Sequence, residues 1–138
     1  WRETLCALLI FPIALAGAAA CRPARGPLEG TRWKLVAWTL SSLYPGDFTL
    51  TAAFSGGKIT GHSAVNSYGG PYKAGPDGAF SVGPLESTLM AGPQDAMRAE
   101  RAYLTLLAQA RSYKLAGDTL TLYDQGGNES LIFQAATD

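Results

Sequence analysis

Large apolar and polar side chains alternate between residues 31 and 90, beginning with Trp33 and Leu35 on one face of an extended segment. A period of two is typical of a strand that buries one face. Glycine pairs and a Pro-Asp-Gly sequence separate the alternating segments, as tight turns require. The pattern predicts short strands at residues 31–38, 48–54, 58–61, 79–82 and 85–90.

Two stretches among these strands lack the alternation. Residues 41–47 include Pro45 and Gly46, so we expect a loop there. Residues 66–72 have the sequence Asn-Ser-Tyr-Gly-Gly-Pro-Tyr, which is dense in residues that adopt positive φ or fix turns. We therefore expect a structured loop at 66–72 that leads into a further strand.

The apolar spacing changes to three and four residues after Pro93, which suits the first turn of a helix. The apolar stripe consists of Ala96, Met97, Ala99, Tyr103, Leu104, Leu107 and Ala110. The residues expected on the solvent side are Arg98, Glu100, Arg101 and Gln109. This pattern predicts one amphipathic helix that packs on the core rather than lining a cofactor site. A terminal antiparallel meander is predicted at residues 113–115, 120–123 and 131–133.

The N-terminal segment is apolar but short. It carries no charge from residue 5 to residue 20, which is a little short for a helix that spans a bilayer. Pro12 and Gly17 would make a poor interior helix, whereas the alanines that end the segment suit a signal peptidase. We expect residues 1–20 to be a signal peptide and the protein to be exported to the periplasmic side of the cell envelope.

Cys21 follows these small residues directly, and the segment that ends at it resembles a lipobox, whose cysteine becomes the lipid-modified first residue of a bacterial lipoprotein. Ala18 stands where lipoboxes usually carry leucine, so ordinary cleavage is the alternative. The only other cysteine, Cys6, lies in the segment that would be removed, which would leave no thiol for a disulfide, a metal site or a nucleophile. We expect residues 21–27 to be a lipidated membrane anchor and tether for a domain at 28–135.

The composition favours a small β-rich domain. Gly 16 and Pro 8, with 47% apolar residues, suit many short strands and turns, and 138 residues suffice for one domain with its appendages. Acidic and basic side chains balance at 11 each, which predicts no long-range field that would attract nucleic acid or an acidic membrane surface. We expect a monomer that binds neither nucleic acid nor a cofactor.

Few residues could carry chemistry. His62 is the only histidine, and Ser63 and Asp77 are its candidate partners, but no Gly-x-Ser-x-Gly sequence frames them. A single histidine without clustered thiols or carboxylates is weak support for a metal site. We therefore expect neither enzymatic activity nor a bound metal. Asn66 and Tyr68 are expected to hold their loop in place rather than to touch a ligand.

Three ordered segments resemble the META domain family, which includes heat-inducible bacterial envelope lipoproteins. Residues 28–35, Leu-Glu-Gly-Thr-Arg-Trp-Lys-Leu, are similar to the family's opening Leu-x-Gly-Thr-x-Trp-x-Leu. Residues 61–72 resemble its Gly-x-x-Gly-Cys-Asn-x-Tyr-x-Gly-x-Tyr, and residues 87–92 resemble its Thr-x-Met-Ala-Cys. The matching positions, which we expect to be structural, are Trp33, Asn66, Tyr68, Gly70, Tyr72, Thr88, Met90 and Ala91.

The resemblance implies an α+β domain, with a strongly bent antiparallel sheet or incomplete β-barrel and one main amphipathic helix packed on it. Val65 and Gly92 replace cysteines that are common in the family, and Ala64 replaces a glycine. If relatives bridge positions 65 and 92, this domain lacks a cross-link that is worth about 2 to 4 kcal/mol in other proteins. Val65 would offset part of that loss by apolar burial.

Two functions follow as expectations. The first is a non-catalytic envelope lipoprotein that binds an unidentified envelope protein, and the resemblance associates it loosely with envelope stress or drug tolerance. The second is a small module whose incomplete barrel takes up a lipid or another hydrophobic ligand, by fold-level analogy with the lipid-binding pilotins of secretion systems. An apolar cavity of about 300 Å³ or more would favour the second function.

Overall fold

The computed structural model describes residues 26–39 and 41–137, so Cys21 and the predicted signal peptide lie outside the described residues. The described residues form nine strands, one 3₁₀ helix and one α-helix. In chain order these elements are β1 Thr31–Trp38, η2 Pro45–Asp47, β2 Thr51–Ser55, β3 Lys58–His62, β4 Ser67–Ala74, β5 Phe80–Val82, β6 Glu86–Ser87, α1 Gln94–Gln109, β7 Ser112–Ala116, β8 Thr119–Tyr123 and β9 Glu129–Ala135.

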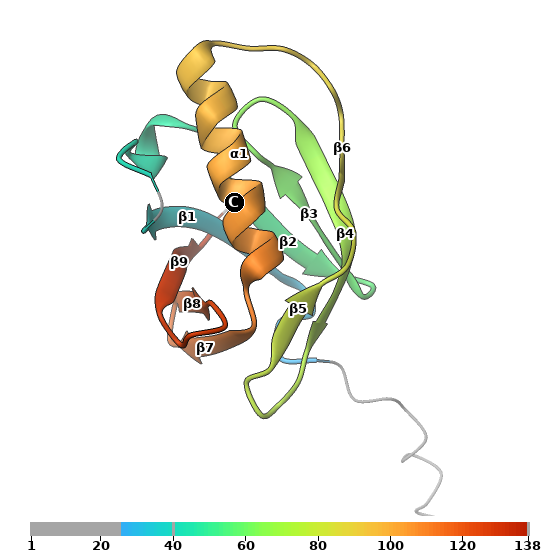
Figure 1. Ribbon diagram of the computed structural model, residues 1–138. Coiled ribbons are helices and arrows are strands. Elements are labelled where there is room, and N and C mark those ends of the chain that lie inside the picture. The colour runs from blue at the N-terminus through green and yellow to red at the C-terminus, as the bar shows by residue number, and fades with distance from the viewer. Residues whose placement is uncertain (1–25, 40, 138) are drawn as a thin grey trace, which may run out of the picture.

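The strands form one antiparallel sheet in the order β5-β4-β3-β2-β1-β9-β8-β7, and β6 pairs with β4. Pairing of β1 with β9 joins the two halves of the chain. Gly56 and Gly57, with φ of 63° and 77°, make the predicted two-residue turn between β2 and β3. Figure 1 shows the sheet curling so that its two edge strands, β5 and β7, approach each other below the C-terminal end of α1.

The two edges meet along a short seam. The Phe80 N–H donates to the Arg111 carbonyl at 3.0 Å, and the Tyr113 N–H donates to the Gly78 carbonyl at 2.9 Å. Beyond this seam α1 covers the gap between the edges (Figure 1). The result is a nearly closed antiparallel barrel with a single helix packed on it, which confirms the predicted fold class.

Side chains from the sheet and the helix fill the interior of the barrel. The alternation in β1 buries Trp33 and Leu35, as predicted. Aromatic rings meet edge to face, and the centroid of Tyr103 on α1 lies 6.3 Å from that of Phe133 on β9. Because the buried cluster begins at Leu28 and ends at Phe133, a chain that starts at residue 21 keeps all of it.

The predicted loop at 66–72 is wrong, because Ser67–Ala74 form the strand β4. Its glycines serve close packing rather than a turn, since a Cβ at Gly70 would lie 2.6 Å from the carbonyl oxygen of Pro84. Conversely, only Glu86–Ser87 of the strand predicted at 85–90 are paired. The strand predicted from residue 48 starts at Thr51, whereas the helix and the terminal meander are confirmed.

Candidate functional site

Glu100 and Asn66 form a buried polar pair between α1 and the segment that precedes β4. The Asn66 backbone N–H donates to Glu100 Oε1, and Asn66 Nδ2 donates to Oε2, both at 2.9 Å. The Ser63 hydroxyl adds a third hydrogen bond to Oε1 at 2.7 Å. Asn66 is 2% exposed and Glu100 is 8% exposed. Three donors therefore hold one carboxylate that the sheet and the helix bury together.

Asn66 also fixes the segment 88–92, called the strap below, which crosses from β6 to the start of α1. Asn66 Oδ1 accepts hydrogen bonds from Thr88 Oγ1 at 2.8 Å and from the Met90 N–H at 2.7 Å. Asn66 Nδ2 donates in addition to the Met90 carbonyl at 3.1 Å. A single side chain thus joins the motif around Asn66 to the motif around Thr88, which are 22 residues apart.

Glu100 is buried, so the prediction that it lies on the solvent side of the helix is wrong. Glu100 lies four residues after Ala96 and three before Tyr103, so it falls on the apolar stripe. The prediction put Glu100 on the solvent side because its side chain is charged, although its spacing from Ala96 and Tyr103 indicates the buried side. Its partner Ser63 was considered only as a nucleophile, and no sequence signal pairs it with Glu100.

The electrostatics of Glu100 follow from these contacts. Burial raises the pKa of its carboxyl group, but the hydrogen bonds from Ser63 and Asn66 lower it more, so the pKa lies below its ordinary value of 4.5. The group is therefore ionised at neutral pH. Because protein donors already occupy both oxygens, the carboxylate is placed to hold the strap and the helix together rather than to take a proton from a substrate.

Ala64 bends the chain so that Asn66 can face Glu100. It has a φ of 82°, and no other described residue except glycine has a positive φ. This backbone conformation costs an alanine roughly 1 kcal/mol, which explains the glycine that the family resemblance leads one to expect here. The Ala64 N–H donates to the Thr49 carbonyl at 2.9 Å, which helps to hold the strained residue in place.

Val65 and Gly92 lie against each other where the strap meets this bend. A Cβ added to Gly92 would lie 3.6 Å from Val65 Cβ and 2.9 Å from Val65 Cγ2. The first distance is within the range of Cβ pairs joined by a disulfide. The second is too short for a side chain at position 92 to coexist with this valine. The two replacements of the family's cysteines are therefore coupled, because Val65 fills the space that Gly92 leaves.

Tyr68 and Tyr103 join β4 to α1 deeper in the core. Their hydroxyl groups lie 2.7 Å apart, and the Tyr68 hydroxyl is 2.7 Å from the Thr51 carbonyl. Burial raises the pKa of both phenols, so both are neutral at physiological pH. Tyr68 therefore anchors its strand by its hydroxyl group, and the pair offers no charged group to a ligand.

Residues 28–35, the opening motif, also form hydrogen bonds that hold segments together, here at the other end of β4. The Tyr72 hydroxyl donates to Glu29 Oε2 at 2.5 Å, and the Gly56 N–H donates to the other carboxylate oxygen of Glu29. Trp33 Nε1 donates to Thr31 Oγ1 at 2.8 Å. Trp33 and Tyr72 thus belong to the core and lie apart from the Asn66 network. No pattern in the sequence had pointed to this role of Glu29.

The candidate catalytic residues do not form a site. Ser63 is fully buried, whereas His62 is exposed, because neighbouring residues of an extended chain point to opposite faces. Asp77 lies in the turn between β4 and β5. No group of three or more potential metal ligands occurs within residues 26–39 and 41–137. No helix in this part of the chain is long and apolar enough to cross a membrane.

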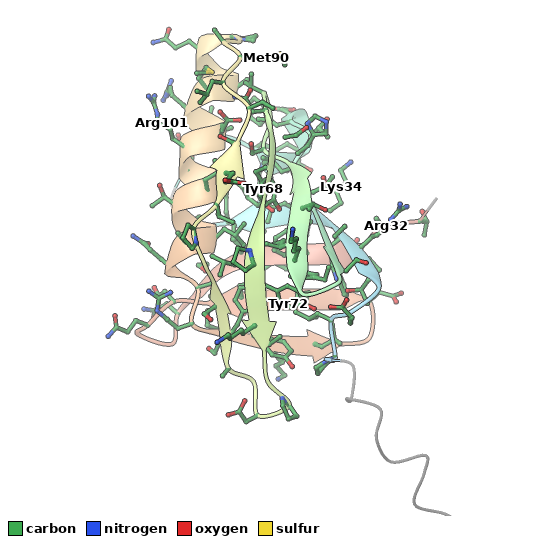
Figure 2. All side chains as sticks on the ribbon, turned by 90° about the vertical axis from the view of Figure 1, so that its right-hand side faces the viewer. Arg32, Lys34, Tyr68, Tyr72, Met90 and Arg101 are labelled. Carbon is green, nitrogen blue, oxygen red and sulfur yellow. The ribbon has the colours of Figure 1, made fainter. Side chains whose placement is uncertain are left out.

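The strap exposes its side chains although its backbone is fixed. Leu89 is 94% exposed and Met90 is 62% exposed, and Ala91 is exposed as well. Figure 2 shows Met90 at the end of the domain where α1 begins, far from Tyr72. This combination makes the strap the candidate functional site of the described residues.

Known proteins match the chain at the level of family and fold. A META domain profile matches residues 26–137. A solved structure of a protein from Burkholderia xenovorans has a TM-score of 0.67 at 23% identity, over 99% of each chain. A DUF4847 family protein from Bacteroides vulgatus has a TM-score of 0.59 at 13% identity, over 81% of this chain and 96% of its own. No curated protein matches.

Proposed function

The chain belongs to the META domain family, and from that premise we propose that it is a non-catalytic, exported envelope lipoprotein that binds an envelope protein through its strap. The exposure of Leu89 and Met90 on a backbone that Asn66 holds in place carries this proposal. Large apolar side chains that cluster on a solvent-exposed surface mark interaction sites. A pre-ordered backbone also lowers the entropic cost of binding.

The position of the strap supports the same function. Gly26 lies beside the Ala74 carbonyl, at the end of β4, whereas the strap begins at the start of β4, where the Thr88 N–H donates to the Ser67 carbonyl. An eight-residue strand separates these two ends by roughly 23 Å. An anchor at Cys21 would therefore hold the end near Gly26 close to the membrane, and the strap would remain available to a protein partner.

The alternative, uptake of a lipid inside the barrel, has less support. Aromatic and aliphatic side chains fill the interior, including Phe54, Tyr103 and Phe133, each at most 1% exposed. A groove of about 470 Å³ is open and lies on the outer face, where Lys58 and Glu86 line it. A hydrophobic ligand would need an apolar enclosure instead.

Cross-linking in the intact envelope tests the proposed interaction. The double variant Leu89→Ser, Met90→Ser should lose a discrete cross-linked adduct that the unchanged protein forms. Leu115→Ser is the matched control, because Leu115 is 39% exposed on β7, away from the strap. An adduct that is unchanged in the strap variant would refute binding through the strap. Mass spectrometry of the mature N-terminus tests the anchor separately, since an unacylated terminus would exclude the lipoprotein.

A further inference from the structure

The outer face of β1 to β4 carries several lysines. Lys34, Lys58 and Lys73 project outward from β1, β3 and β4, and all three are exposed. No carboxylate of the described residues forms a salt bridge with any of them. Arg32 lies on the same face, and Figure 2 shows it beside Lys34. We call these three lysines and their surroundings the basic face.

The acidic residues lie mostly elsewhere, although the net charge of the chain is zero. Asp118 and Asp124 lie in the turns of the terminal meander β7–β9, and Glu129 begins β9. Figure 1 places this meander across the barrel from β3 and β4. Two anions of the described residues border the basic face: Glu86 lines the groove on it, and the Glu29 carboxylate accepts a hydrogen bond from Gly56 in the turn before Lys58. The fold therefore separates charges that the composition balances, and one side of the domain can attract anions.

The basic face has a floor of small side chains. A row of paired residues crosses it in the order Arg32, Ala53, Thr60, Gly69 and Glu86. This row contains no large apolar side chain. The long lysine side chains can therefore extend beyond the row and contact a flat surface that lies against this face of the domain. Such a face suits electrostatic contact with a layer of charged groups rather than insertion of the protein into a hydrocarbon layer.

The start of the described chain lies at the margin of the basic face. An added Cβ at Gly26 would lie 3.5 Å from the carbonyl oxygen of Ala74, the residue that follows Lys73. Only four residues separate Gly26 from Cys21. Even fully extended, five residue steps span at most about 17 Å. A lipid on Cys21 would therefore keep Lys73 and the basic face close to the bilayer surface.

We propose that the basic face lies on an anionic lipid surface, where Lys34, Lys58 and Lys73 contact the headgroup phosphates. The nearness of this face to the membrane rests on the lipid anchor proposed at Cys21. The contact between the lysines and the phosphates depends only on charge. Attraction between lysines and anionic headgroups acts within about 8 Å at physiological salt, and the short tether keeps the domain near enough to the bilayer for the lysines to come into that range. The contact would orient the anchored domain with the outer face of β1 to β4 towards the membrane.

Vesicle co-sedimentation tests this contact without the lipid anchor. The probe protein is the chain from residue 21 with Cys21→Ser, which keeps the whole core cluster. We expect it to bind vesicles of phosphatidylcholine with 30 mol% phosphatidylglycerol, used at about 0.1 M salt, and to be released at about 0.5 M salt. Replacing Lys34, Lys58 and Lys73 together by glutamine should weaken binding by about fivefold for each lysine.

Matched variants separate this proposal from the other possibilities. Glutamine at Arg98, Arg101 and Lys114, which are exposed cations outside the basic face, should leave vesicle binding within twofold. Leu89→Ser should also leave it unchanged, so failure of the strap hypothesis would not affect this assay. Equal binding to pure phosphatidylcholine vesicles, or an equal loss in the control variant, would overturn the proposal. Binding of a polyglutamate peptide without vesicle binding would overturn it in favour of an acidic protein partner.

Discussion

Asn66 binds both carboxylate oxygens of Glu100, one through its backbone N–H and the other through its side-chain amide, each at 2.9 Å. The same side-chain amide group also forms hydrogen bonds with Thr88 and Met90 of the strap. The order of the strap and the docking of α1 therefore depend on one buried pair.

Glu100→Ala should lower the free energy of unfolding by about 3 kcal/mol, because it leaves the donors of Ser63 and Asn66 buried without an acceptor. Glu100→Gln should cost less, about 1.5 kcal/mol, since one amide oxygen can still accept two of the three hydrogen bonds. Urea unfolding measures both values. Arg101→Ala, on the exposed side of the same helix, is the control and should stay within about 0.5 kcal/mol of the unchanged protein.

Stability should fall as the pH falls through the acid range. The pKa of Glu100 is lower in the folded protein than its ordinary value of 4.5, so the unfolded chain binds more protons between these two values. The contribution of Glu100 is complete above about pH 5 and is lost as the pH approaches the folded pKa. Thermal unfolding between pH 7 and pH 3 should show a smaller acid dependence in Glu100→Gln. Identical slopes in the two proteins would contradict the assignment.

Ala64→Gly should stabilise the protein by about 1 kcal/mol, because glycine adopts the φ of 82° at this position without steric cost. A rise of about 4 °C in Tm would correspond to that gain. Ala53→Gly serves as the control, since Ala53 lies in the regular strand β2, where glycine should destabilise. No gain from Ala64→Gly would mean that Ala64 is not strained.

The double variant Val65→Cys, Gly92→Cys should form a disulfide on oxidation, since the two Cβ positions lie 3.6 Å apart. The closed loop of about 28 residues predicts a gain on the order of 3 kcal/mol in the oxidised over the reduced protein. Thermal unfolding with and without a reducing agent measures the difference. Val65→Cys alone should show no effect of the reducing agent, and a double variant whose thiols stay free would contradict the observed approach of the strap to the bend.

The periodic order of apolar residues was sufficient to predict most elements, because burial follows that period. The fold class, a bent antiparallel sheet with one packed helix, came from the resemblance to the META family. Trp33 and Leu35 alternate with polar residues and are buried, and the stripe that contains Tyr103 and Leu107 faces the core. The family motifs also pointed to Asn66 and Thr88 before their contact was visible. What failed were local interpretations of composition, such as the loop at 66–72, where glycines allow another segment to approach β4 closely.

Only the tertiary structure showed which polar residues meet. Glu100, Asn66 and Ser63 are up to 37 residues apart along the chain, and a charged residue on a helix has no local feature that reveals a buried partner. Tertiary structure also decides that Leu89 is exposed, because that network holds its segment in place. It likewise separates the charges of the basic face from those of the terminal meander. Each depends on distances between distant segments, which the closure of the barrel sets and which no short stretch of sequence contains.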